Sequence, residues 1–185
     1  MTNALPLPDF AHERVEVVTG RRSGLFIAVA LHSSVLGSAL GGARLWTYPR
    51  WSDALGDALR LSAAMTLKNA AAGLDAGGGK SVIGLPEGSV LDADRRRAAF
   101  LDLGDAVESL GGLYRTAEDV GSTTEDMLVV SERTAHVVGL PDAVGGSGEP
   151  AGPTSLGVYS SLVATLERAV GSGDVRPRKP RGEVN

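Results

Sequence analysis

The sequence predicts an α/β fold in which a mostly parallel or mixed sheet is flanked by helices. Two observations predict it. Between residues 43 and 116, short apolar runs alternate with two longer segments of helical periodicity, in the order strand, helix, strand, helix, strand. Glycine-rich turns rather than long linkers separate these segments. Because such alternation gives right-handed crossovers, we expect a ligand to bind near the carboxyl ends of the strands.

The amino-terminal part of the chain is expected to form three strands. Residues 12–18 alternate apolar and polar side chains, residues 21–24 supply a turn, and residues 25–31 are an apolar run. A third strand is expected at 43–47. Before it, residues 38–42 are small, which leaves the backbone unshielded as the approach of a ligand would require.

Two helices are expected in the middle of the chain. Apolar residues at helical spacing with alanines between them predict a helix at 52–72, ended by Gly73. A glycine pair closes the second helix, at 92–110. Buried strands are expected after each helix, at 81–85 and at 113–116.

The last third of the chain is expected to be helical and then irregular. A capping box at 122–125 opens one helix, and Thr154 is expected to cap the final helix at 155–170. The resulting division is a flexible amino terminus at 1–10, one globular domain at 11–170 and a disordered tail at 171–185.

Composition limits the classes of partner. The 185 residues, 43% of them hydrophobic, can bury one good core. A formal net charge of −4 gives no basic excess, so we expect no nucleic acid and no membrane as partner. The absence of cysteine excludes a disulfide scaffold and a thiolate site and fits a reducing cytoplasm. No stretch approaches a membrane-spanning length, so we expect a cytoplasmic protein that binds a small molecule or another protein.

Two lysines and an aspartate form the candidate site. Lys68 lies near the end of the first expected helix and Lys80 follows three glycines, so both cations flank one tight loop and can face one cavity. Asp119 lies where an open α/β sheet places a catalytic carboxylate. Deamination of an amino acid needs this set: a cation for the carboxylate, a base for water and a group that handles protons on nitrogen. Taken singly, each of the three is most often an ordinary surface or loop residue, so only the joint pattern favours a site.

Other motifs fail on inspection. A phosphate-binding loop that ends at Lys80 would need glycine where the chain has Leu74, and a helix where a strand is expected. A dinucleotide fingerprint that starts at Gly146 would need glycine at Ala151. The three histidines lie far apart in the sequence and without cysteine, so no metal site is expected.

Taken together, several separated blocks resemble the amino-terminal domain of the glutamate/leucine/phenylalanine/valine dehydrogenase family, and most resemble its leucine and valine dehydrogenases. The blocks, in order, are ALGGAR at 39–44, MTLKNA at 65–70, GGGKSVI at 77–83, TAEDVG at 116–121 and PTSLGV at 153–158. The likeness runs from about residue 25 to about residue 170. It implies a substrate-binding and oligomerisation domain that assembles into a homo-oligomer.

The resemblance also implies roles for the candidate residues. By it, Lys68 binds the substrate carboxylate, Lys80 is the general base that activates water, and Asp119 assists proton transfer at the amine. Thr154 corresponds to a family threonine that approaches the nicotinamide of NAD or NADP at the domain junction.

The substrate side chain is expected to be apolar. By resemblance, Gly41, Gly42 and Met65 line the substrate cavity. Glutamate dehydrogenases carry a lysine where this chain has Leu40, and Leu40 with the small Ala117 suits a branched aliphatic side chain. The expected ligand is therefore a small apolar L-amino acid or its 2-oxo acid.

The chain also departs from the family pattern. Ala43 stands where threonine is usual, and residues 84–87 differ from the common Gly-Asp-Pro. The family continues into a Rossmann domain, which this sequence lacks, so no cofactor is expected to bind this chain alone. Three hypotheses stay open: an inactive dehydrogenase half, a non-catalytic amino-acid-binding or oligomer-forming module, and nucleic-acid contact through the basic tail. That tail carries Arg176, Arg178, Lys179 and Arg181.

Overall fold

The computed structural model describes residues 10–148 and 150–176, and the chain divides into two compact units, Met1–Gly148 and Glu149–Asn185. We expected one domain over 11–170, and the final helix of that range falls in the second unit. The boundary lies in a glycine-rich stretch, where few side chains are available to make contacts. Most of the expected flexible amino terminus and most of the expected tail lie outside the described residues.

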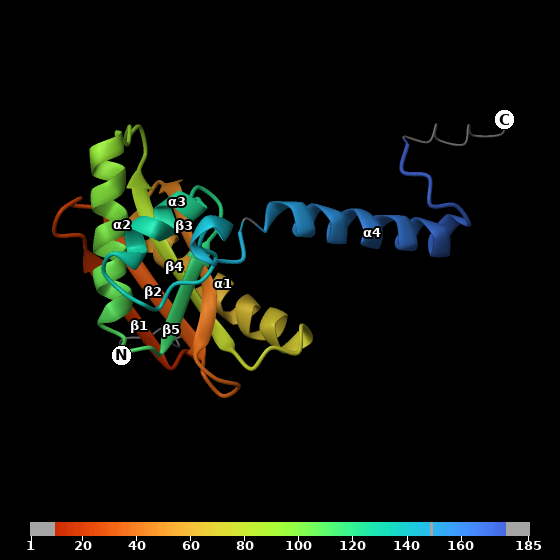
Figure 1. Cartoon of the computed structure of the whole chain (residues 1–185), viewed down its shortest axis with the longest axis horizontal. Coiled ribbons are helices and arrows are strands. Elements are labelled where there is room, and N and C mark those ends of the chain that lie inside the picture. The colour runs from red at the N-terminus through yellow and green to blue at the C-terminus, as the bar shows by residue number, and fades with distance from the viewer. Residues whose placement is uncertain (1–9, 149, 177–185) are drawn as a thin grey trace, which may run out of the picture. The chain divides into compact units, whose positions relative to one another are not determined.

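A five-stranded mixed sheet forms the centre of the first unit (Figure 1). Its strands lie in the order β1-β2-β4-β3-β5. The pairs β1/β2 and β2/β4 are antiparallel, whereas β3 pairs in parallel with both β4 and β5. The expected α/β class with a mixed sheet is confirmed. The strands are β1 Arg14–Thr19, β2 Phe26–Ser33, β3 Ala39–Tyr48, β4 Gly77–Pro86 and β5 Tyr114–Glu118.

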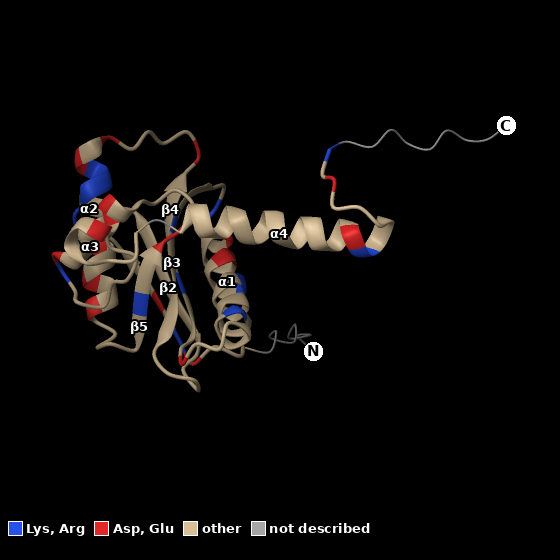
Figure 2. Ribbon diagram, turned by 45° about the vertical axis from the view of Figure 1, so that its right-hand side comes forward, with Lys and Arg blue, Asp and Glu red and all other residues tan. Residues whose placement is uncertain are grey.

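Helices cover the two faces of this sheet (Figure 1). On one face lies α1 (Trp51–Ala71), and on the other lie α2 (Ala93–Glu108) and α3 (Thr124–Ser131). A short 3₁₀ turn, η1 (Asp142–Val144), precedes the end of the first unit. In the second unit, α4 (Ala151–Val170) carries charges only near its carboxyl end (Figure 2).

The glycine-rich segments lie inside strands, which corrects the loop expected before Lys80. We expected strands to begin at 43 and 81, but β3 begins at Ala39 and β4 at Gly77. The cause is packing against α1, because a Cβ on Gly78 would lie 2.1 Å from Thr66 Oγ1. In addition, Asn69 Nδ2 donates to the Gly77 carbonyl at 2.6 Å. Glycine is a weak strand former, but here it lets the helix backbone approach the sheet.

Two expected helix starts are also corrected. The box that opens α3 lies one residue later than expected, since Thr123 Oγ1 accepts from the Asp126 amide and the Asp126 carboxylate accepts from the Thr123 amide. Thr154 does not cap α4, which begins at Ala151. Pro153 fits inside that first turn because the first amides of a helix need no partner within the helix.

Candidate active site

Alternation along the central strands gathers the site residues on the sheet face that α1 covers. Gly78 contacts α1, so Lys80, two residues later on β4, projects to the same side. The register pairs Leu40 with Gly78 and Gly42 with Ala117, and it brings Gly42 beside Lys80. Gly42 therefore lies between the lysine on β4 and the alanine on β5.

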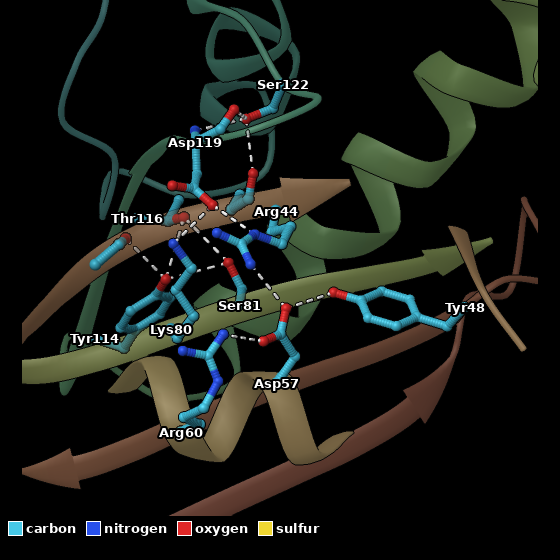
Figure 3. A network of polar contacts seen from close by, with 12 residues as sticks. Arg44, Tyr48, Asp57, Arg60, Lys80, Ser81, Tyr114, Thr116, Asp119 and Ser122 are labelled. Atoms are coloured by element: carbon cyan, nitrogen blue, oxygen red, sulfur yellow. Dashed lines mark hydrogen bonds and ion pairs between the residues drawn. The ribbon is translucent and has the colours of Figure 1, made fainter. Parts of the chain in front are cut away.

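The central contact is an ion pair between Lys80 and Asp119 (Figure 3). The Nζ of Lys80 lies 2.8 Å from Oδ2 of Asp119, which directly follows β5. Lys80 is only 4% exposed. Burial lowers the pKa of Lys80, and the Asp119 partner offsets only part of that effect. A buried amine with a lowered pKa can accept a proton nearer neutral pH than a free lysine can.

Asp119 stays ionised beside these cations. Burial alone would raise the pKa of its carboxyl, but the hydrogen bonds from Lys80 and Arg44 hold that pKa below its usual value. The lowered pKa of Lys80 thus favours its neutral form, whereas the lowered pKa of Asp119 favours its charged form, and the two groups lie in one partly enclosed place. Groups arranged in this way are typical of acid–base sites.

Arg44 is a member of the site that the sequence reasoning did not single out. Its Nε donates to Asp119 Oδ2 at 3.0 Å and its Nη1 donates to Asp57 Oδ2 at 2.8 Å (Figure 3). A usable signal was present, because Arg44 stands two residues after Gly42 on the same strand and so projects to the same face.

Asp57 was also missed, together with the two groups that hold it. Asp57 accepts from the Tyr48 hydroxyl at 2.8 Å and from Arg60 at 2.6 Å. Burial raises the pKa of Tyr48, and the hydrogen bond to Asp57 raises it further, so its hydroxyl stays a donor. Asp57 and Arg60 are one turn apart on α1, and this spacing was the only sequence signal for the pair.

Backbone and hydroxyl contacts hold the Asp119 loop in place. The Asp119 amide donates to Ser122 Oγ at 2.9 Å, and that hydroxyl donates to the Ala43 carbonyl at 2.7 Å. A Cβ on Gly42 would lie 2.7 Å from the Asp119 Cβ, so only glycine fits under this carboxylate. Gly41 is equally constrained, since its Cβ would lie 1.7 Å from the Gly79 carbonyl oxygen.

A second polar cluster lies on the opposite face of the same strands. Tyr114 donates to the Gly41 carbonyl at 2.9 Å and lies 3.1 Å from Ser81 Oγ. Burial raises the pKa of Tyr114 to about 12, so the hydroxyl stays protonated. This buried cluster ties β3, β4 and β5 together beneath the site.

The other expected substrate residues lie around this network but outside it. Lys68 is exposed on α1 and makes no ion pair within the part of the chain that the structure describes. Met65, one turn earlier, is half-buried, as are Leu40 and Ala117 on the sheet. The neighbour of Lys68, Asn69, donates to the Leu40 carbonyl at 3.2 Å, which joins this part of α1 to β3. Thr154 lies in the first turn of α4, in the second unit, and its role beside a cofactor stays a prediction.

A cavity of about 770 Å³ adjoins the ion-pair network, with Arg44, Asp57 and Val120 in its wall. A second cavity, of about 590 Å³, has mainly apolar walls around Phe26 and Trp51. Neither cavity is lined by Lys80 or Asp119. The first cavity is the one beside the ion-pair network, because Arg44 and Asp57 belong to both.

Residues 10–148 and 150–176 contain no group of three metal-ligating side chains of the His, Cys, Asp or Glu types. Across the same residues, no helix combines the length and the apolar character that a bilayer crossing requires.

Comparison with known proteins identifies the family. Residues 12–136 match the family model described as "Glu/Leu/Phe/Val dehydrogenase, dimerisation domain". This chain belongs to the Glu/Leu/Phe/Val dehydrogenase family. The matched range includes Lys68, Lys80 and Asp119, and the resemblance inferred from the sequence blocks is confirmed.

Individual dehydrogenases support the same assignment. The chain is 44% identical over 166 residues to leucine dehydrogenase of Thermoactinomyces intermedius, which covers 89% of this chain and 44% of that protein. It is 42% identical over 168 residues to valine dehydrogenase of Streptomyces coelicolor, with 90% and 45% covered. The crystal structure of L-tryptophan dehydrogenase from Nostoc punctiforme matches with a TM-score of 0.64 and 34% identity, over 88% of this chain and 44% of that one. The chain therefore spans less than half the length of these relatives.

Proposed function

We propose that this chain is the substrate-binding and oligomer-forming half of an NAD(P)-dependent dehydrogenase that deaminates an apolar L-amino acid. The observation that carries the proposal is the ion pair at 2.8 Å between the buried Lys80 and Asp119, beside Gly42. The relatives named leucine and valine dehydrogenase support this class of substrate.

Each residue has a defined task in this proposal. Lys68, which lies on α1, binds the substrate carboxylate. Lys80, whose pKa is lowered by burial, accepts a proton from the water that attacks the imine. Asp119 exchanges protons with the substrate nitrogen. The overall reaction converts the amino acid, water and the oxidised cofactor into a 2-oxo acid, an ammonium ion, the reduced cofactor and one proton.

The cofactor supplies the acceptor for the hydride from the substrate Cα, and we propose that another domain binds it. The glycines at 77–79 do not form a phosphate cradle, because they lie buried in β4. A Cβ on Gly79, for example, would lie 2.5 Å from the Tyr114 ring. These three glycines therefore do not fit the phosphates of a dinucleotide.

The side-chain preference follows from the apolar residues near the site. Leu40 and Ala117 lie on adjacent strands of the face that carries Lys80, and Met65 is on the covering helix. None of the three can neutralise a second carboxylate. We therefore propose leucine, valine or a similar amino acid rather than glutamate as substrate, and a cytoplasmic homo-oligomer as the working form.

Activity restored by a cofactor domain tests this proposal. The chain is mixed with, or fused to, the dinucleotide-binding half of a leucine dehydrogenase, and reduction of NAD or NADP is followed after addition of leucine or glutamate. We expect leucine-dependent reduction that Lys80→Met and Asp119→Asn abolish. Tight binding of leucine without any reduction would support the alternative, a non-catalytic amino-acid-binding or oligomer-forming module.

A further inference from the structure

The two oxygens of the Asp119 carboxylate are used differently. Oδ2 accepts from Lys80 at 2.8 Å and from Arg44 at 3.0 Å (Figure 3). Oδ1 has no hydrogen-bond partner among residues 10–148 and 150–176. With Oδ2 doubly occupied, Oδ1 is the oxygen left to receive a ligand.

We propose that Arg44 is a positioning residue, anchored by Asp57, that fixes the Asp119 carboxylate so that Oδ1 faces the ammonium group of the substrate. The inference rests on the proposed function, because it assigns the orientation of a carboxylate in that site. Arg44 itself touches Asp119 and Asp57 but none of the atoms that react.

The guanidinium of Arg44 suits this task because its geometry is rigid. Its Nε donates to Asp119 and its Nη1 donates to Asp57, so one planar group joins two carboxylates on different elements. Both side chains of the Arg44–Asp119 pair are at least three-quarters buried. A lysine at position 44 would keep the charge but has a single ammonium on a flexible stem, which cannot reproduce the fork.

Asp57, the second carboxylate that Arg44 contacts, is itself held in place. Asp57 lies on α1 and is held by the Tyr48 hydroxyl from the end of β3 and by Arg60 on α1. These contacts fix the plane of Asp57, and therefore the plane of Arg44, from outside the site. The chain of ion pairs thus links the surface of α1 to the carboxylate beside Lys80.

Arg44 and Asp57 act on Lys80 in opposite directions. Burial lowers the pKa of Lys80 most strongly and Asp119 raises it, while the charge of Arg44 lowers it and the charge of Asp57 raises it. These charged groups come from β3, from α1 and from the loop after β5. Removal of Arg44 should therefore raise the pKa of Lys80, and removal of Asp57 should lower it. General loss of structure would move both variants toward the pKa of a free lysine.

Nuclear magnetic resonance of the full chain, labelled with ¹³C at the lysine Cε, measures these shifts directly. The sequence contains only three lysines, Lys68, Lys80 and Lys179, so each signal can be assigned by substitution with arginine. We expect the Lys80 titration to move to higher pH in Arg44→Gln and to lower pH in Asp57→Asn. The Lys68 signal is the internal control. Shifts of Lys80 in the same direction in both variants, or no shift in either, would overturn the assigned network.

A pair of ligands tests the orientation of Oδ1. An L-amino acid presents an ammonium group to Asp119, whereas the matching 2-oxo acid does not. In Arg44→Lys, which keeps the charge, we expect leucine to bind about tenfold more weakly, because one charge-assisted hydrogen bond is lost. The 2-oxo acid should bind within about twofold of its wild-type affinity.

Failure of the positioning role of Arg44 and failure of the proposed function give different results. Equal loss of both ligands, or no loss of either, in Arg44→Lys would contradict the positioning role while leaving the proposed function intact. If the wild-type chain binds neither ligand, the proposed function fails, and the lysine titration still decides whether Arg44 and Asp57 set the charge state of Lys80.

Discussion

The two faces of the sheet are built for different purposes from the same strands. Toward α2 and α3 the sheet buries large side chains, among them Phe100, Leu103 and Met127 on the helices. Toward α1 the buried apolar residues are mostly alanines, and they share the face with Lys80, Arg44 and Asp57. The difference shows how alternation along a strand separates stability from chemistry.

Strand β4 shows this separation residue by residue. Val82 and Lys80 face α1, whereas Ile83 joins the large core on the other side and Ser81 bonds to Tyr114 there. Glycines on the α1 face allow the helix to approach closely. Because glycine has no side chain, this face buries little apolar area that could stabilise the fold. We therefore expect substitutions on the two faces to differ in sign as well as in size.

The largest effect is expected on the core face. Phe100→Ala removes a fully buried ring and should lower the free energy of unfolding by about 3–5 kcal/mol. The matched control is Leu67→Ala, because Leu67 is 74% exposed on α1 and should change stability by less than about 0.5 kcal/mol. Urea denaturation followed by circular dichroism measures both. Similar losses in the two variants would contradict the assignment of the core.

A smaller loss is expected where the strands of the site meet. In Gly41→Ala the new Cβ would lie 1.7 Å from the Gly79 carbonyl oxygen, so backbone must move, at a cost of about 1–3 kcal/mol. Gly56→Ala on α1 is the control, since beyond its chain neighbours and the adjacent backbone of its own helix no heavy atom lies within 4 Å of the added Cβ. There we expect a gain of up to about 1 kcal/mol from helix propensity. Equal stability of the two variants would show that β3 and β4 are not in close contact.

On the site face, loss of a charge should stabilise. Lys80→Met removes the cost of a buried ammonium, while Asp119 keeps its ion pair with Arg44. We expect the free energy of unfolding at pH 7 to be unchanged or higher by about 1 kcal/mol. A loss above about 2 kcal/mol would mean that Lys80 is a structural residue.

The same variant should change the pH dependence of stability. The folded pKa of Lys80 lies below its ordinary value of 10.5, so protonation favours the unfolded chain. Wild-type stability should therefore gain a contribution as pH rises from the folded pKa toward 10.5, and Lys80→Met should lack it. Denaturation series at several alkaline pH values measure this slope.

The smallest effect on stability is expected at His12, just before β1. His12 Nε2 lies 2.9 Å from Ser62 Oγ and 3.1 Å from the Leu59 carbonyl, which joins the segment before β1 to α1. Burial lowers the pKa of His12 below 6.5, so the neutral ring favours the folded state and stability falls as pH drops below that value. His12→Gln should flatten this acid slope slightly in thermal melts. An unchanged slope would contradict the role of His12.

The sequence predicted the elements better than it predicted the contacts between them. Lys80 could be named because it follows three glycines, and Asp119 because it follows an expected strand. The position of Arg44, two residues after Gly42, indicates the sheet face but not its partners, because Asp57 and Asp119 lie 13 and 75 positions away in the sequence. The early starts of β3 and β4 were missed because glycine disfavours strands, and packing against Thr66 and Asn69 on α1 overrides that preference.

The most direct test of the proposed site is to add leucine to the ¹³C-lysine-labelled chain and to follow the signals of Lys80 and Lys68. We expect both signals to move along a single saturation curve with leucine and to stay in place with glutamate. If the Lys80 signal does not respond to leucine while the chain remains folded, the lysine and aspartate on this face of the sheet do not form an amino-acid site.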